Sequence, residues 1–107
     1  MAGWFRTYYV NEGLWLYFET DDEGWAARQV TIRAADSQSV TAASLEEVRY
    51  LRDHADLEAM QRYERQYGVL AEGSLDGWQE EPLAAQIPAE EFERVWGEAR
   101  RVLGDSC

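Results

Sequence analysis

The sequence predicts an α+β protein, in which an antiparallel sheet of three to four strands packs against a long kinked central helix and a C-terminal amphipathic helix. Residues 14–33 alternate between two sets of side chains around a turn that contains Gly24, as in a β-hairpin. Residues 44–67 begin with a helix-capping sequence and continue with helically spaced apolar residues. Residues 88–103 carry a continuous apolar stripe with helical spacing.

The hairpin consists of two strands joined by an acidic turn at Asp21–Gly24. Each strand is rich in aromatic and β-branched residues, and successive side chains of a strand point to opposite faces of the sheet. In the first strand Leu14, Leu16 and Phe18 alternate with Trp15, Tyr17 and Glu19. In the second strand the alternation places Ala26, Arg28, Val30 and Ile32 on one face, and Trp25, Ala27, Gln29 and Thr31 on the other.

Two further strands extend the hairpin into a meander. Residues 4–10 form the first strand and are joined to the hairpin by Asn11–Gly13, residues that suit a tight turn. Residues 38–43 predict a short fourth strand. Aromatic residues occur on both faces of the first two strands, so we expect the second face to be partly covered by a helix or by another copy of the chain. The helices are expected to pack mainly on one face.

The central helix is predicted over about 44–67. Ser44 and Glu47 have the spacing of a capping box, in which the serine accepts from the amide three residues on and the glutamate reaches back to the serine amide. The apolar register slips near residues 53–56, so we expect a kink or break there. Gly68 ends the helix.

Residues 68–87 show no regular pattern and are predicted to form an irregular loop. The C-terminal helix follows over about 88–103, because Pro88 suits a first helical turn and acidic residues follow it. Its apolar stripe consists of Phe92, Val95, Trp96, Ala99, Val102 and Leu103.

The length of 107 residues predicts a single domain over residues 1–107. Five Trp, six Tyr and three Phe supply enough apolar area for one modest core. The net charge of −11 argues against direct binding to nucleic acid or to an anionic membrane, and favours either high solubility or a basic protein partner.

A cytoplasmic protein is expected from the cysteine count, because Cys107 is the single cysteine and cannot form an internal disulfide. No apolar run has the pattern of a signal peptide or the ~20 residues of a membrane helix. The pattern leaves open whether the protein is a monomer or a homodimer.

The residue inventory excludes several kinds of chemistry and predicts no cofactor or metal and no catalytic residue. A single histidine and a single cysteine exclude a zinc site, and no lysine is present for a phosphate-binding loop. The carboxylates around Asp21 lack EF-hand spacing, which favours a solvated turn. His54 lies at the helix break and is more simply a surface or capping residue than a general base. Glu19 could pair with Arg28 or Arg33 of a neighbouring strand, and a structural ion pair is the favoured interpretation.

Two sets of residues are candidates for binding. Trp78 lies in an acidic loop without apolar periodicity, so it is either an anchor for a partner or a lid on the core. The predicted partner-binding residues are Trp78, Asp76, Glu80, Glu81, Asp21, Asp22 and Glu23. An aromatic pocket between sheet and helices is a second possibility, lined by Tyr8, Tyr17, Glu19, Trp25 and Arg28.

Two segments of the sequence carry a resemblance, one over residues 16–30 and one over residues 87–96. They resemble the motifs YxEIDxxGxxxRxV and IxxEEFExxW of a family of small bacterial α+β domains of unknown function, and they cover about a third of the chain. Members of that family occur in bacterial competition settings, so the resemblance implies an immunity-type or accessory binding role. It implies no catalytic residues.

Three hypotheses follow. The leading one is a non-enzymatic acidic protein, of immunity or inhibitor type, that occludes a basic protein partner. The second is a small enzyme or small-ligand-binding protein with the aromatic pocket as its site. The third is an inhibitor that mimics nucleic acid with spaced carboxylates.

Overall fold

The computed structural model describes residues 3–71, 75, 77, 80 and 83–104. Four strands come first: β1 (Gly3–Tyr9), β2 (Leu14–Thr20), β3 (Ala26–Arg33) and β4 (Gln38–Ser44). The helices α1 (Leu45–His54) and α2 (Leu57–Tyr67), a short strand β5 (Ala85–Gln86) and the helix α3 (Ala89–Gly104) follow. The described part of the chain is therefore α+β, as the sequence predicts.

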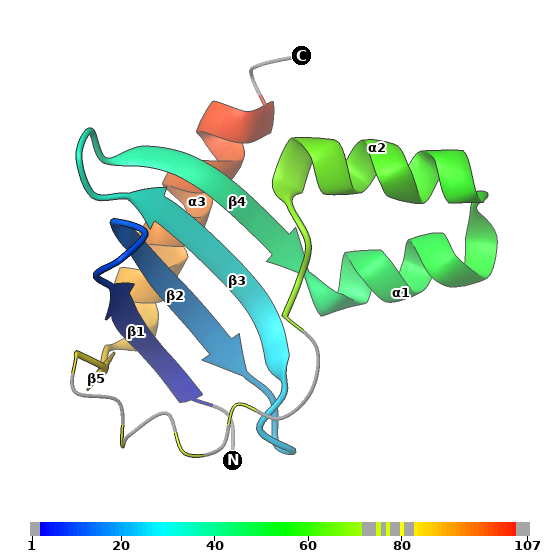
Figure 1. The fold of residues 1–107 in the computed structure, drawn as a ribbon. Helices are drawn as coiled ribbons and strands as arrows, with labels where there is room; N and C mark the ends of the chain where they lie inside the picture. Colours follow the sequence, from blue (N-terminus) through cyan, green and yellow to red (C-terminus); the bar gives the residue numbers. More distant parts are fainter. Residues whose placement is uncertain (1–2, 72–74, 76, 78–79, 81–82, 105–107) are drawn as a thin grey trace.

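The strands form one antiparallel sheet in the order β4-β3-β2-β1-β5 (Figure 1). Strands β1 to β4 make the predicted meander. Over the described residues the sheet has five strands rather than three to four, because Ala85 and Gln86 pair with Arg6 and Phe5 at its outer edge. This strand lies inside the segment 68–87 that is predicted to be an irregular loop. The sequence does not predict it, because two residues are too few to show an alternating pattern.

The predicted central helix is two helices that form a hairpin beyond the β4 edge (Figure 1). Helix α1 ends at Ala55, whose backbone is extended, and Asp56 begins α2 by accepting a hydrogen bond from the Ala59 amide at 2.9 Å. The register slip therefore marks a break with a new N-cap. Helix α2 ends at Gly68, whose amide donates to the Glu64 carbonyl.

Helix α3 lies across one face of the sheet (Figure 1). Phe92 and Ala99 of this helix are fully buried against Val30 and Ala42, and Ile87 completes the cluster. The apolar stripe predicted for this helix is thus the face that covers the sheet.

The opposite face of the sheet is covered by other parts of the chain. Phe5 and Phe18 pack against each other across β1 and β2, with tilted rings whose centroids are 5.2 Å apart. Tyr63 of α2 and Leu70 join them in a second buried cluster. The helices are therefore not confined mainly to one face, because α1 and α2 add apolar side chains to this second cluster.

Gln29 fixes the segment that follows α2. Its side chain donates to the Val69 carbonyl at 3.4 Å and accepts from the Ala71 amide at 2.8 Å. The buried side-chain amide of Gln29 takes the place of a neighbouring strand and gives two backbone groups of this segment a hydrogen-bond partner.

A register shift in β3 changes one predicted side-chain direction. Glu19 pairs with Arg28, but Thr20 pairs with Ala26, so Ala27 is an extra residue in the β3 strand. Ala26 consequently belongs to the cluster of Phe5 and Phe18, whereas strict alternation would have placed it on the Arg28 face. Within the described ranges, no helix is long and apolar enough to cross a membrane.

We expect Gly68→Ala to destabilise the protein. Gly68 has a φ of +90°, and an added Cβ would lie 2.4 Å from Thr41 Cγ2 on β4. Strain in this backbone region costs about 1–3 kcal/mol, and the contact adds to that cost. Urea denaturation followed by far-UV circular dichroism measures the change.

Gly97→Ala is the matched control, because Gly97 lies in α3 with open space around the added Cβ. This substitution should stabilise the protein by about 0.5–1 kcal/mol. Equal stability of Gly68→Ala and the wild type would contradict the close approach of α2 to β4.

Candidate functional site

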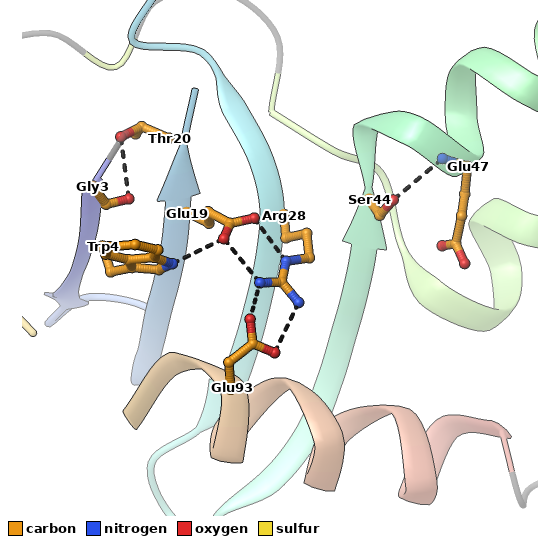
Figure 2. Close-up of polar contacts among 8 residues, drawn as sticks. All are labelled: Gly3, Trp4, Glu19, Thr20, Arg28, Ser44, Glu47 and Glu93. Atoms are coloured by element: carbon orange, nitrogen blue, oxygen red, sulfur yellow. Dashed lines mark hydrogen bonds and ion pairs between the residues drawn. The ribbon is translucent and has the colours of Figure 1, made fainter. Parts of the chain in front are cut away.

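Glu19 and Arg28 form an ion pair on the α3 face of the sheet. They are directly opposite each other on β2 and β3, and Arg28 Nε and Nη2 donate to Glu19 Oε1 and Oε2 at 2.7 and 2.9 Å (Figure 2). Trp4 Nε1 also donates to Glu19 Oε2, at 2.9 Å. From α3, Glu93 binds the outer side of the guanidinium, with Nη1 to Oε2 at 3.2 Å. The sequence leaves Arg28 and Arg33 open as partners of Glu19; the partner is Arg28, and the sequence does not predict Glu93.

The charge state of this pair follows from these contacts. The hydrogen bonds from Arg28 hold the pKa of Glu19 below its ordinary value despite partial burial, and Trp4 adds to this effect. The hydrogen bonds to Glu19 and then to Glu93 raise the pKa of Arg28. Since a general acid at neutral pH needs a raised carboxyl pKa, Glu19 is suited to hold α3 on the sheet rather than to donate a proton.

Arg100 on α3 forms a second cluster at the edge of β4. Its Nε donates to the Ala42 carbonyl at 2.9 Å, and its Nη1 donates to Glu47 Oε2 at 3.0 Å. Its Nη2 donates to the Tyr63 hydroxyl at 3.2 Å. The guanidinium carbon also lies 3.8 Å from the centroid of the Tyr67 ring, so this one side chain contacts β4, α1 and α2.

The N-terminus of α1 departs from the predicted capping box. Ser44 Oγ accepts from the Glu47 amide at 3.2 Å, as predicted (Figure 2). The Ser44 amide, however, donates to the Tyr63 hydroxyl at 2.9 Å, not to Glu47. The Glu47 carboxylate is thereby released to bind Arg100 and to accept from Tyr63 at 2.6 Å.

These contacts set the pKa values of the second cluster. Burial raises the pKa of Glu47, but hydrogen bonds from Arg100 and Tyr63 outweigh it, so the pKa lies below its ordinary value. Burial, together with the hydrogen bond to Glu47, raises the pKa of Tyr63 to about 12. Nothing in the sequence pattern indicates this cluster, because Arg100 reads as a residue that complements the negative end of a helix.

The two arginines flank a cleft between α1, α2 and α3. Both guanidinium groups lie over the Trp96 ring, at 5.2 Å for Arg28 and 4.5 Å for Arg100 from its centroid. The cleft has a volume of about 660 Å³, and Ser44 and Tyr50 also line it. Every buried side-chain nitrogen and oxygen in the described part of the chain has a hydrogen-bond partner. No group of three or more His, Cys, Asp or Glu residues that could hold a metal occurs there either.

The structure brings only part of the predicted aromatic pocket together. Tyr8, Tyr17, Glu19 and Arg28 share the α3 face, where Tyr17 packs against the buried cluster beneath the helix. Tyr8 instead packs on Trp15, with ring centroids 4.8 Å apart. Trp25 lies away from them, in a groove lined by the second buried cluster.

The predicted partner-binding residues divide in a similar way. Asp21 Oδ1 accepts from the amides of Glu23 and Trp25 at 2.9 and 3.0 Å, so Asp21 stabilises its own turn. Asp22 and Glu23 are exposed at the tip of this turn. Glu80 is also exposed. Asp76, Trp78 and Glu81 lie outside the described residues.

A groove that the sequence does not predict runs between the α1–α2 hairpin, the β2–β3 turn and residues 68–71. It has a volume of about 560 Å³. The described residues of its apolar lining are Trp25, Ala26, Leu45, Val48, Met60, Val69, Leu70 and Ala71, and its described charged residues are Arg49, Arg52 and Glu64. Trp25 and Val69 are 43% and 64% exposed, so apolar surface extends onto the rim.

Comparisons of the chain with protein-family models, with curated proteins and with solved structures find no match.

We expect Arg100→Met to destabilise the protein by about 2 kcal/mol, because it removes the charged donor from Glu47, Tyr63 and the Ala42 carbonyl. Methionine keeps an apolar stem against Tyr67. Arg101→Met is the control, since Arg101 pairs with Glu98 on the exposed side of α3 and such pairs contribute roughly 0–1 kcal/mol. Urea denaturation compares the two, and equal losses would contradict a structural role for Arg100.

Acid should weaken the fold through Glu19 and Glu47. Their folded pKa values lie below the unfolded value of about 4.3, so between the two values the unfolded chain binds more protons. Their contribution is complete above the unfolded value and is lost as the pH falls through the folded values. Urea titrations at a series of acidic pH values measure the free energy of unfolding. As the pH falls, this free energy should decrease less steeply for Glu19→Gln/Glu47→Gln than for the wild type.

Glu12→Gln, at the exposed β1–β2 turn, is the control for the acid titration. Its free energy of unfolding should fall with decreasing pH as steeply as that of the wild type. A double variant with the same steepness would contradict the lowered pKa values of Glu19 and Glu47.

Proposed function

We propose that this protein is a non-enzymatic binding protein of immunity or inhibitor type, which occludes a basic protein partner with the surface around the β2–β3 turn. The observation that carries the proposal is an exposed tryptophan beside two exposed carboxylates: Trp25, Asp22 and Glu23. Tryptophan is a frequent anchor at interfaces, and charges at the rim of an interface speed association with a partner of opposite charge.

Three further features support this proposal. The net charge of −11 produces long-range attraction for a basic protein. Hydrogen bonds from the Glu23 and Trp25 amides to Asp21 hold the turn in one conformation, which lowers the entropy lost on binding. The resemblance to the bacterial domains found in competition settings implies the same kind of role. A cytoplasmic location belongs to the proposal, because one cysteine suits a reducing compartment.

A second candidate function is the binding of a small ligand in the cleft beside Trp96. It is favoured by the volume of about 660 Å³, which lies within the range of ligand sites, and by the aromatic rings in the lining. The polar groups that line the cleft already bind one another, as Arg100 does with Glu47 and Tyr63. This argues against ligand binding, because few polar groups remain to orient a ligand. A rise in melting temperature with one member of a small-molecule panel, abolished in Trp96→Ala, would favour this candidate.

The leading proposal is tested by capture on the tagged protein from its native host, with bound proteins identified by mass spectrometry at low and moderate salt. We expect a stoichiometric basic protein, whose capture falls as salt rises because exposed charges are screened. The variant Asp22→Lys/Glu23→Lys should weaken binding of the purified partner by roughly tenfold, mostly through a slower association rate.

The matched control is Glu12→Lys/Glu90→Lys, which makes the same change in net charge at exposed positions of the β1–β2 turn and of α3. It should bind almost as well as the wild type. An equal loss of affinity in both double variants would mean that net charge, and not the β2–β3 turn, governs binding, and would overturn the proposed surface. Capture of an acidic partner, or of no partner at all, would overturn the proposal as a whole.

A further inference from the structure

The groove beside Trp25 has a local charge that differs from that of the whole chain. The protein carries −11, but among the described residues that line the groove Arg49 and Arg52 face one carboxylate, that of Glu64. Arg49 and Arg52 are three residues apart on α1 and therefore project from one side of the helix. The α1 side of the groove thus presents a pair of positive charges, whereas the β2–β3 turn on its other side is acidic.

These arginines differ from those that hold the fold together. Arg28 and Arg100 have their donors occupied by carboxylates and carbonyls. No carboxylate in the described part of the chain pairs with Arg49, and Arg52 meets Asp53 only at 4.0 Å with both side chains about two-thirds exposed. An exposed contact of this kind contributes little, so both guanidinium groups are available to another carboxylate.

The floor of the groove also offers backbone groups. Gln29 binds the Val69 carbonyl and the Ala71 amide, which are groups that point to the same side in an extended segment. The amide and carbonyl of Leu70, the residue between them, consequently point away from Gln29. Among the described residues, neither of these two Leu70 groups has a hydrogen-bond partner.

We propose that this groove binds an extended segment of a partner protein, with apolar side chains packed between Trp25, Met60 and Val69, and with an adjacent carboxylate held by Arg49 and Arg52. The main chain of that segment pairs with the amide and carbonyl of Leu70, as in other recognition of peptides by strand addition. The two guanidinium groups on α1 select a carboxylate at that end of the groove. The exposed Trp25 and Val69 favour a polypeptide over a small molecule, since a small ligand in the groove would leave these rim side chains uncovered.

The test is selection from a displayed library of short random peptides on the purified protein, followed by affinity measurement with labelled peptides from the selection. We expect the selected sequences to share a run of apolar residues next to Asp or Glu. Arg49→Glu/Arg52→Glu should weaken their binding at least tenfold, and so should Val69→Glu, which changes a side chain already 64% exposed. Amide hydrogen exchange at Leu70 should slow in the complex.

Arg65→Glu/Arg94→Glu is the control, because these arginines are also exposed and have no ion pair within the described ranges, but they lie outside the groove. It should bind the peptides as the wild type does. Selected peptides without acidic residues, equal loss in both arginine pairs, unchanged exchange at Leu70 or no enriched peptide would each overturn the proposal. The variant Asp22→Lys/Glu23→Lys, which should bind the basic partner more weakly, should still bind the selected peptides. This proposal and the proposed function can therefore fail separately.

Discussion

The arrangement of the helices depends on the hydrogen bonds and the ion pair that the guanidinium group of Arg100 makes. This group joins α3 to the carbonyl of Ala42 on β4, to Glu47 on α1 and to Tyr63 on α2. Strand β4 is an edge strand, and its outward-facing backbone groups would otherwise offer a template for another strand. Arg100 and the hydroxyl of Tyr63 occupy two of these groups, so the contacts that place the helix hairpin also protect the edge.

The same arrangement explains how two carboxylates can be partly buried in the fold. Two of its carboxylates, Glu19 and Glu47, lie partly buried, and each is matched by an arginine that also packs on an aromatic ring. Partial burial strengthens these pairs relative to exposed ones, because less solvent screens them. The cost is that Arg28 and Arg100 are committed to the structure, which leaves the cleft beside Trp96 with few free polar groups.

The face of the sheet opposite α3 carries both of the proposed binding surfaces. Among the described residues no helix is laid across this face, and the segment after α2, held by Gln29, borders the groove there. Exposed apolar side chains, an ordered acidic turn and two available arginines lie around this groove. A partner that presents basic residues to the turn and an acid-flanked apolar segment to the groove would match both parts of the surface.

The sequence by itself determined the elements whose patterns are local: the β2–β3 hairpin, the Ser44 cap, the end of α2 at Gly68 and the apolar stripe of α3. It also indicated that Glu19 pairs with Arg28 or Arg33, because the residues suit an ion pair between neighbouring strands, but the register that selects Arg28 came from the tertiary structure. Only the tertiary structure decided the rest. Strand β5 is too short for a pattern, Ala26 changes face through a bulge, and the partners of Glu47 and Arg100 are brought together from helices more than 50 residues apart in the sequence. The groove likewise depends on how the helix hairpin packs against the β2–β3 turn, and periodicity within one segment carries no information about contacts between segments.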